Sequence, residues 1–403
     1  MRNIQVNLLF TIVAALVVLL SGRTLVAHTA FLKRFSIPAP VVGGVLVAIA
    51  LALADAFASL RVSFDMSLRD NLLLMFFTTV GLSADARMLA RGGPKLMIFL
   101  VVSTVFIAIQ NFVGIAAALA MDLHPVVGLL GGSVTLTGGH GTGAAYGGRF
   151  GDTMNIAGAM ELTMACATTG LVLGSLLGGP LAEYLIRRHR LSPTAPAAGA
   201  LVSDTDEDVD YVSVQSVLDT LLAILACLAF GKVLARVVAG TGFILPDFLF
   251  CLLFGVVIRN TANFVPKLAI SRSTVDLLGG VSLSLFLVMA LMGMRLVDLV
   301  SLAGPLFVIL GLQLVAMALY AVFVTFRVMG RDYDAAVLAA GHVGFALSST
   351  AAALAIMKTI TERRGASPLA FLIVPMVGAF FIDIANALLI QGYLALPLFG
   401  FPQ

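Results

Sequence analysis

The chain has 403 residues, of which 60% are hydrophobic and only 11% charged, and its mean hydropathy is +1.07. A typical soluble domain is about 45–50% apolar and about 25% charged, so one globular core cannot hide this much apolar surface. The 24 basic and 21 acidic residues nearly balance, which argues against nucleic-acid binding. Composition therefore excludes an ordinary soluble enzyme, a nucleic-acid binder and a disordered protein, and it favours a polytopic α-helical membrane protein.

The first apolar run, 5–26, is the first predicted membrane helix. A secretory signal would need a more basic start than Arg2 and a clean small-residue cleavage pattern, whereas the nearest candidate pattern contains His28. Further apolar runs of the length that crosses a bilayer, roughly 17–25 residues, follow throughout the chain. These predicted spans lie near 38–57, 69–84, 96–120, 125–147, 155–186, 215–238, 246–260, 277–296, 305–328, 334–357 and 368–396.

A polar segment, 187–214, separates the spans into two blocks. It opens with a basic cluster, carries two prolines and ends in a run of acidic residues. Because it has no apolar stripe to pack, it is predicted to be a solvated linker. The chain thus divides into an N-terminal transmembrane repeat, 1–186, the linker, and a C-terminal transmembrane repeat, 215–403.

The two blocks are predicted to be copies of one another, since short matches recur at a nearly constant offset. The matching segments are Gly22–Leu25 with Gly231–Leu234, Ile37–Pro38 with Leu245–Pro246, Phe77–Gly81 with Met289–Gly293, and Gly131–Ser133 with Ala340–His342. Internal repeats of this kind are a hallmark of secondary transporters.

The charge pattern favours inverted repeats. If the fifth segment of each repeat is a re-entrant or broken-helix hairpin, about five transmembrane helices remain, and the odd number inverts the second repeat. With the N-terminus outside, most lysines and arginines fall in inside loops, as the positive-inside rule requires. The predicted fold is an all-α polytopic membrane protein with two inverted-topology repeats, both termini outside and the linker inside.

The fifth segment of the first repeat is poor in helix-forming residues. Residues 131–143 contain six glycines and five side chains that can hydrogen-bond, and each interior glycine costs a helix about 1 kcal/mol relative to alanine. Irregular backbone at membrane depth is tolerated where it is buried in protein or lines a cavity. There its carbonyl oxygens can coordinate Na⁺ and its N–H groups can hold a carboxylate. The alternative is a small-residue seam for helix packing.

The counterpart in the second repeat, 341–350, has fewer glycines but three consecutive hydroxyls. Two such segments entering from opposite faces would meet near the midplane, as alternating access needs. The substrate-binding candidates on the two segments are Thr135, Thr137, Gly138, Gly139, His140, Gly141, Thr142, Gly143, His342, Ser348, Ser349 and Thr350.

Ionisable residues inside spans are costly and mark functional sites. Asp383 lies deep in the last span and is the first candidate ligand for Na⁺, together with the hairpin carbonyls. Glu161 and Asn386 are the other ion-binding candidates. The alternatives are a structural pairing for Asp383 and an interfacial position for Glu161.

Other polar residues leave two interpretations open. His140 and His342 are either ligands or satisfied core imidazoles, and the pair Gln110-Asn111 is either interhelical glue or functional. The chain lacks the zinc-protease, serine-hydrolase and phosphate-loop motifs. It is therefore predicted not to be an enzyme and to need no cofactor.

Several long segments resemble the bacterial glutamate:Na⁺ symporter family. They are 64–70, 137–145, 164–171, 281–287, 333–342 and 374–383. The resemblance covers nearly the whole chain apart from the linker, and it implies a homodimer in the bacterial inner (cytoplasmic) membrane that takes up L-glutamate coupled to Na⁺. On this reading both termini are periplasmic, the linker is cytoplasmic, and transport is elevator-like alternating access.

One departure from the family pattern lies in the second hairpin, where Ala346 and Ser348 stand in place of glycines and Ala351 in place of a proline. These residues stiffen the loop. The alternatives to a glutamate symporter are a sodium-coupled dicarboxylate carrier, a cation/proton antiporter and a channel.

Overall fold

The computed structural model describes residues 2–35, 37–85, 93–154, 156, 158–193, 212–239, 246–261, 270–293 and 303–399. Residues 194–211 of the predicted linker and Leu245 of the second matched pair lie outside them. Helices occupy most of every predicted span, although several of the spans are divided into shorter helices, so the helical class is confirmed. The chain forms two compact units, each of which combines segments from both predicted repeats.

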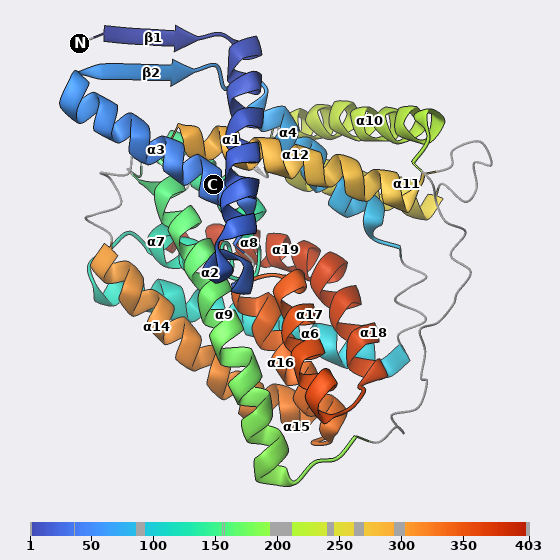
Figure 1. Cartoon of the computed structure of the whole chain (residues 1–403). Helices are drawn as coiled ribbons and strands as arrows, with labels where there is room; N and C mark the ends of the chain where they lie inside the picture. The colour runs from blue at the N-terminus through green and yellow to red at the C-terminus, as the bar shows by residue number, and fades with distance from the viewer. Residues whose placement is uncertain are drawn as a thin grey trace. The chain divides into compact units, whose positions relative to one another are not determined.

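Unit 1 takes residues Met1–Ala86 and Asp206–Val297. Its elements (Figure 1) are β1 (Arg2–Val6), α1 (Leu8–His28), α2 (Ala30–Arg34), α3 (Ala39–Ala58), β2 (Leu60–Phe64), α4 (Arg69–Ser83), α10 (Val214–Ala239), α11 (Asp247–Thr261) and α12 (Arg272–Met292). Helix α4 packs against both α11 and α12, and α3 packs against α12. The third helix of each predicted repeat therefore packs on the second helix of the other.

Glycines set the closest helix approaches in unit 1. A β-carbon on Gly22 of α1 would stand 2.1 Å from the carbonyl oxygen of Ala39 at the start of α3. A β-carbon on Gly231 of α10 would stand 2.7 Å from Sγ of Cys251 in α11. Gly22 and Gly231 occupy matching positions in the two predicted repeats. Each of them allows the first helix of its repeat to pack closely against the second helix.

Unit 1 also contains a small sheet that was not expected from the sequence. Strands β1 and β2 pair in parallel, with Arg2 opposite Leu60 and Val6 opposite Phe64. Both are rich in the β-branched and aromatic residues that favour strands. The connection through α1 and α3 brings them side by side, as a parallel pair requires. The chain is therefore mostly, rather than entirely, helical.

Unit 2 takes residues Arg87–Thr205 and Asp298–Pro402. Its elements (Figure 1) are α6 (Gly93–Ala120), α7 (Pro125–Leu130), α8 (Gly139–Met154), α9 (Ala159–His189), α14 (Ala303–Tyr320), the π-helix η2 (Ala321–Thr325), α15 (Phe326–Val328), α16 (Tyr333–Leu347), α17 (Thr350–Arg364), α18 (Pro368–Met376), the π-helix η3 (Val377–Phe381), α19 (Ile382–Leu394) and the 3₁₀ turn η4 (Pro397–Phe399). Helix α9 packs against α8, α16 and α17, and α6 packs against α7, α14 and α19.

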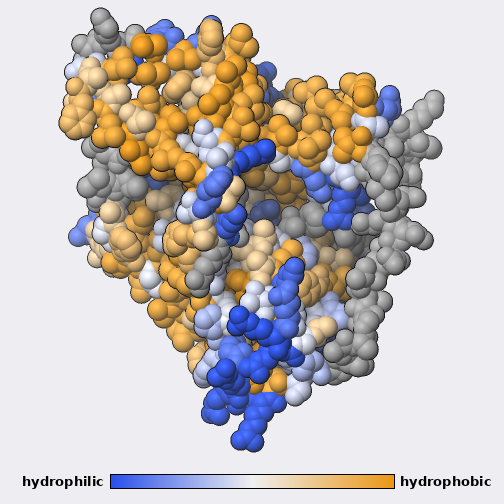
Figure 2. All heavy atoms as spheres, in the orientation of Figure 1, coloured by the Kyte–Doolittle hydropathy of each residue, from blue (hydrophilic) through white to orange (hydrophobic). Residues whose placement is uncertain are grey.

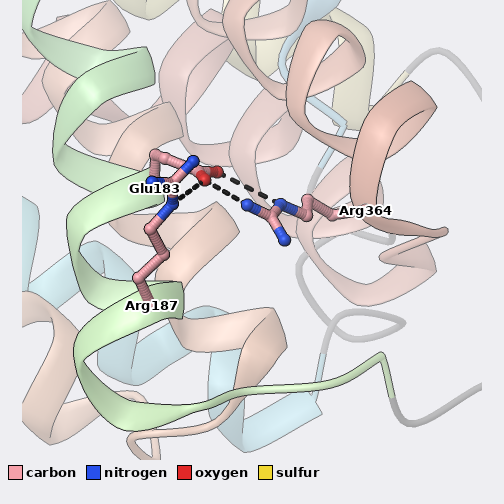
Figure 3. Close-up of polar contacts among 3 residues, drawn as sticks. All are labelled: Glu183, Arg187 and Arg364. Atoms are coloured by element: carbon pink, nitrogen blue, oxygen red, sulfur yellow. Dashed lines mark hydrogen bonds and ion pairs between the residues drawn. The ribbon is translucent and has the colours of Figure 1, made fainter.

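An ion cluster ties two helix ends together in unit 2. The Glu183 carboxylate of α9 accepts hydrogen bonds from Arg187 on the same helix and from Arg364 at the end of α17 (Figure 3). The Arg364 Nε to Glu183 Oε2 distance is 3.2 Å. Because Arg364 also donates to the other carboxylate oxygen through its Nη2, the pair is bidentate.

Seven helices of the described chain are long and apolar enough to cross a membrane. They are Leu8–His28, Ala39–Ala58, Gly93–Ala120, Ala159–His189, Val214–Val238, Arg272–Met292 and Ala303–Val328. In Figure 2 hydrophobic residues dominate the visible face of the unit 1 helices, while the end of unit 2 where α9 stops is hydrophilic. This apolar surface needs lipid as its solvent, so the chain is a multi-pass membrane protein.

Candidate functional site

The first predicted hairpin is an interrupted helix. Helix α7 ends at Leu130, residues 131–138 form consecutive turns, and α8 begins at Gly139. Gly139 has a φ of 66°, a left-handed conformation that favours glycine. Residues 131–137 are buried, so the irregular backbone is enclosed by protein, as membrane depth demands. The predicted break in helical structure is confirmed here.

The second predicted hairpin is interrupted only at its hydroxyl run. Helix α16 continues through Gly341 and Gly344 to Leu347, and α17 starts at Thr350. Between them Ser349 is extended, and its Oγ accepts from the backbone N–H of Ala352 at 3.2 Å. Ser349 is thus the N-cap of α17. The second segment is thus interrupted over two residues, Ser348 and Ser349.

Gln110 of α6 joins the two breaks. Its Nε2 donates to the carbonyl oxygen of Ala346 at 2.9 Å, and its Oε1 accepts from Thr137 Oγ1 at 2.7 Å. A β-carbon on Gly139 would stand 3.7 Å from the carbonyl oxygen of Ser348. The N-terminus of α8 therefore lies beside the residues that precede α17, within unit 2.

A second polar chain fixes the turn at 131–138. Asn111 Oδ1 accepts from the backbone N–H of Ser133 at 3.0 Å, and Asn386 Nδ2 donates to the Ser133 carbonyl oxygen at 3.1 Å. Asn111 is on α6 and Asn386 is on α19, so the turn is held from both sides. Gln110 and Asn111 do act as interhelical glue, but they join the two broken segments in particular.

Helix α9 packs along α8 and the second break. His140 Nε2 lies 3.2 Å from Thr168 Oγ1. A β-carbon on Gly170 would stand 2.3 Å from the carbonyl oxygen of Leu347, so glycine is required for α9 to reach the end of α16. Glu161 is buried in the first turn of α9.

Asp383 lies where helical geometry changes. Pro375 removes a backbone donor inside α18, and the π-helix η3 follows two residues later. Asp383, half-buried, is in the first turn of α19. It precedes Asn386 by three residues, so both lie on one face of the helix.

The remaining candidates lie at different distances from the two breaks. Thr135 donates to the Leu130 carbonyl oxygen at 2.6 Å and closes the end of α7. His342 is fully buried inside α16 among aromatic rings, and its Nδ1 lies 2.9 Å from Thr325 Oγ1. Its Nε2 has no hydrogen-bond partner among the described residues, so the imidazole is buried in the core but satisfied at one nitrogen only. Gly138, Ser348 and Thr350 lie at the breaks. Gly141, Thr142 and Gly143 lie in the first turns of α8, beyond the first break.

Comparison with known proteins covers nearly the whole chain. The family model for sodium/glutamate symporters matches residues 4–366. The sodium/glutamate symporter of Escherichia coli (strain K12) is 49% identical over 399 residues, which span 98% of this chain and 99% of that protein. The sodium/glutamate symporter of Haemophilus influenzae is 44% identical over 387 residues, which span 94% and 95% of the two chains.

Proposed function

Since the chain belongs to the sodium/glutamate symporter family, we propose that unit 2 carries the site at which Na⁺ and L-glutamate bind for coupled uptake. The chain is a transporter and not an enzyme, with Na⁺ as its coupling ion. The observation that carries the proposed location is the meeting of two interrupted helices at Gln110, where backbone polar groups are freed deep inside the unit.

Glutamate carboxylates bind at the two helix starts. The N-termini of α8 and α17 lie close together, and the partial positive charge at each helix start favours an anion. Thr135 and Thr137 already donate their hydroxyl hydrogens within the protein. We therefore assign the side-chain contacts with glutamate to Ser348 and Thr350, beside the backbone of Gly138, Gly139 and Gly141.

Na⁺ binds on the other side of the turn. Asp383 supplies the negative charge, and Asn386 together with the carbonyl oxygens of the turn supplies neutral ligands, the donor set that broken helices offer to Na⁺ in transporters. Glu161 is a further ion-binding candidate because it is a buried acid beside α8. We assign no Na⁺ contact to His140, Thr142 and Gly143. These residues lie in the first turns of α8 and hold that helix in place beside the site.

The membrane potential explains why Na⁺ must be coupled. Glutamate carries one net negative charge, so its inward movement alone opposes an inside-negative potential worth about 2.3 kcal/mol per charge per 100 mV. One Na⁺ makes the step electroneutral, and a second makes the potential assist uptake.

In transporters with inverted repeats, the repeats rearrange around a site at their interface, so that the site opens to one side of the membrane at a time. The shared environment of Gly22 and Gly231 supports duplication. We propose that unit 2 moves as an elevator-like carrier, that unit 1 is the scaffold and forms the homodimer contact, and that the protein resides in the bacterial inner membrane with periplasmic termini.

Uptake of radiolabelled L-glutamate into proteoliposomes tests the proposed function. An inward Na⁺ gradient is compared with an equal K⁺ gradient, and accumulation is expected only with Na⁺. Competition by unlabelled dicarboxylates that exceeds competition by glutamate would favour the dicarboxylate carrier. Proton flux without any amino acid would favour the antiporter.

A further inference from the structure

Two buried oxygen atoms beside the first break have no hydrogen-bond partner. Ser133 is fully buried, Asn386 is 1% exposed, and neither Ser133 Oγ nor Asn386 Oδ1 is paired with any atom of the described chain. Buried polar atoms in folded proteins nearly always have a partner. Two such oxygen atoms on neighbouring residues therefore indicate a bound ligand that is coordinated by oxygen atoms.

Neighbouring contacts show that the two residues lie side by side. Asn386 Nδ2 donates to the Ser133 carbonyl oxygen, which also accepts from the backbone N–H of Gly138 at 2.9 Å. The Ser133 carbonyl is thereby saturated, and the Asn386 Oδ1 is left free for another contact. A β-carbon on Gly138 would stand 2.7 Å from the Val134 carbonyl oxygen and 2.9 Å from Asn386 Nδ2, so the Asn386 amide packs directly on the turn.

The chemistry of these groups selects the ligand. Hydroxyl, amide and carbonyl oxygens are hard neutral donors, which suit an alkali or alkaline-earth cation better than a transition metal. Among the described residues no group of three His, Cys, Asp or Glu side chains could hold a metal. Asp383, one turn before Asn386 on the same helix face, adds a negative charge without having to be a ligand.

We propose that Ser133 Oγ and Asn386 Oδ1 are direct ligands of a transported Na⁺, with the Val134 carbonyl oxygen beside them. This inference rests on the proposed function, in which Na⁺ is the coupling ion, and it adds Ser133 as a ligand. Na⁺ bound there bridges α19 to the turn that leads into α8. The proposed function places a glutamate carboxylate at the start of α8. Bound Na⁺ would therefore order the turn 131–138, which leads directly into that binding site.

The variant Ser133→Ala removes one proposed ligand and breaks no side-chain hydrogen bond within the described part of the chain. Na⁺ binding to the purified full chain is measured as thermal stabilisation during titration with NaCl, with KCl holding the ionic strength constant. We expect the half-maximal Na⁺ concentration to rise at least about tenfold, the effect of losing about 1.4 kcal/mol, while the melting temperature without Na⁺ stays unchanged.

Ser103→Ala is the matched control. Ser103 lies on α6 of the same unit, is fully buried, and also has an Oγ without a partner. The Ser103→Ala variant should bind Na⁺ with the same affinity as the wild type. Ser133→Cys keeps the side-chain volume but replaces oxygen with a soft sulfur, and it should lose Na⁺ affinity as Ser133→Ala does.

A measurement on the wild type needs no variant. Hydrogen exchange of peptides that cover 131–138 and 382–390 should slow in Na⁺ and remain unchanged in K⁺. Unchanged exchange, or Ser133 variants with wild-type Na⁺ affinity, would overturn the proposed ligands while Na⁺-driven uptake by the wild type persists. Absence of that uptake would instead overturn the proposed function itself.

Discussion

Gln110 holds the two broken segments together through its side chain. Its amide group is fully buried and bonds both Thr137 and the Ala346 carbonyl oxygen, while Gln313 Nε2 donates to its backbone carbonyl oxygen at 2.7 Å. The broken segments come from different repeats, so no local interaction could set their spacing. The side chain of Gln110 does so from a third helix.

Replacing Gln110 with alanine should therefore impair both stability and transport. Two buried groups lose their partner, which costs about 1–3 kcal/mol, partly offset because Thr137 Oγ1 also lies 3.3 Å from the Ala346 carbonyl oxygen. Thermal unfolding should show this loss, and the glutamate concentration for half-maximal uptake should rise. Gln313→Ala, which breaks a single bond, is the control with a smaller effect. A destabilised Gln110→Ala variant with wild-type half-saturation would make the residue purely structural.

The sequence predicts the two interrupted segments but not their limits. Glycines and hydroxyls mark 131–143 and 341–350, whereas the structure confines the breaks to 131–138 and 348–349. Gln110 and Asn111 could be interpreted as interhelical glue, but their partners, like those of Ser133, could not be predicted, because these partners are more than 20 residues away along the chain. His342 is a candidate because it lies in segment 341–350, while its contacts are Thr325 and the aromatic rings of the core.

At the scale of elements, helix limits follow from apolar length, and helix contacts follow from small residues. Gly81 of α4 is one more such contact, since a β-carbon there would stand 2.1 Å from the Leu252 carbonyl oxygen of α11. The strands β1 and β2 escaped prediction because five-residue strands carry little periodic signal and Arg2–Val6 runs directly into an apolar helix.

Gly22→Ala should destabilise the protein by about 1–3 kcal/mol, because the added methyl group meets backbone rather than a movable side chain. Gly280→Ala on α12 is the matched control, since nothing lies within 4 Å of its β-carbon position. That change should leave stability equal or raise it by about 0.5–1 kcal/mol. Melting curves of the two purified variants test the contrast, and equal curves would refute the proposed close packing of α1 on α3.

The ion cluster at Glu183 should matter little for stability. Its carboxylate and the Arg364 guanidinium are 34% and 38% exposed, and exposed pairs contribute about 0–1 kcal/mol. Glu183→Gln should lower the melting temperature slightly at low salt and not at all at high salt, since salt screens the pair. A large loss that salt does not reduce would show that Glu183 has a packing role beyond the ion pair.

On the scale of the whole molecule, the repeats and the compact units divide the chain differently. Sequence matching separates residues 1–186 from 215–403, whereas each unit draws on both halves. The pairing of α4 with α11 and of α6 with α14 was not predictable, because contacts between apolar helices leave no distinctive pattern in one sequence. What the charges do predict is topology.

Labelling with a membrane-impermeant maleimide on intact cells tests that topology. Ser63 in β2 and Arg188 in α9 are both exposed and are assigned to opposite sides of the membrane. Ser63→Cys should be labelled from outside, whereas Arg188→Cys should react only after the cells are opened. The three native cysteines are buried and should give little background. Labelling of both variants, or of Arg188→Cys alone, would contradict the placement of the N-terminus outside.

The interleaving of the two units also dictates the order in which the protein can mature during synthesis. Helix α4 emerges early, yet its partners α11 and α12 begin at Asp247 and Arg272. At a translation rate of about 5–20 residues per second, α4 waits roughly 10–30 s for its partners. During that interval its apolar and glycine faces must be covered by lipid or by an insertion factor. A ribosome stalled after α9 would therefore hold an N-terminal half that is inserted but not assembled, and quality-control proteases should recognise it as unfinished.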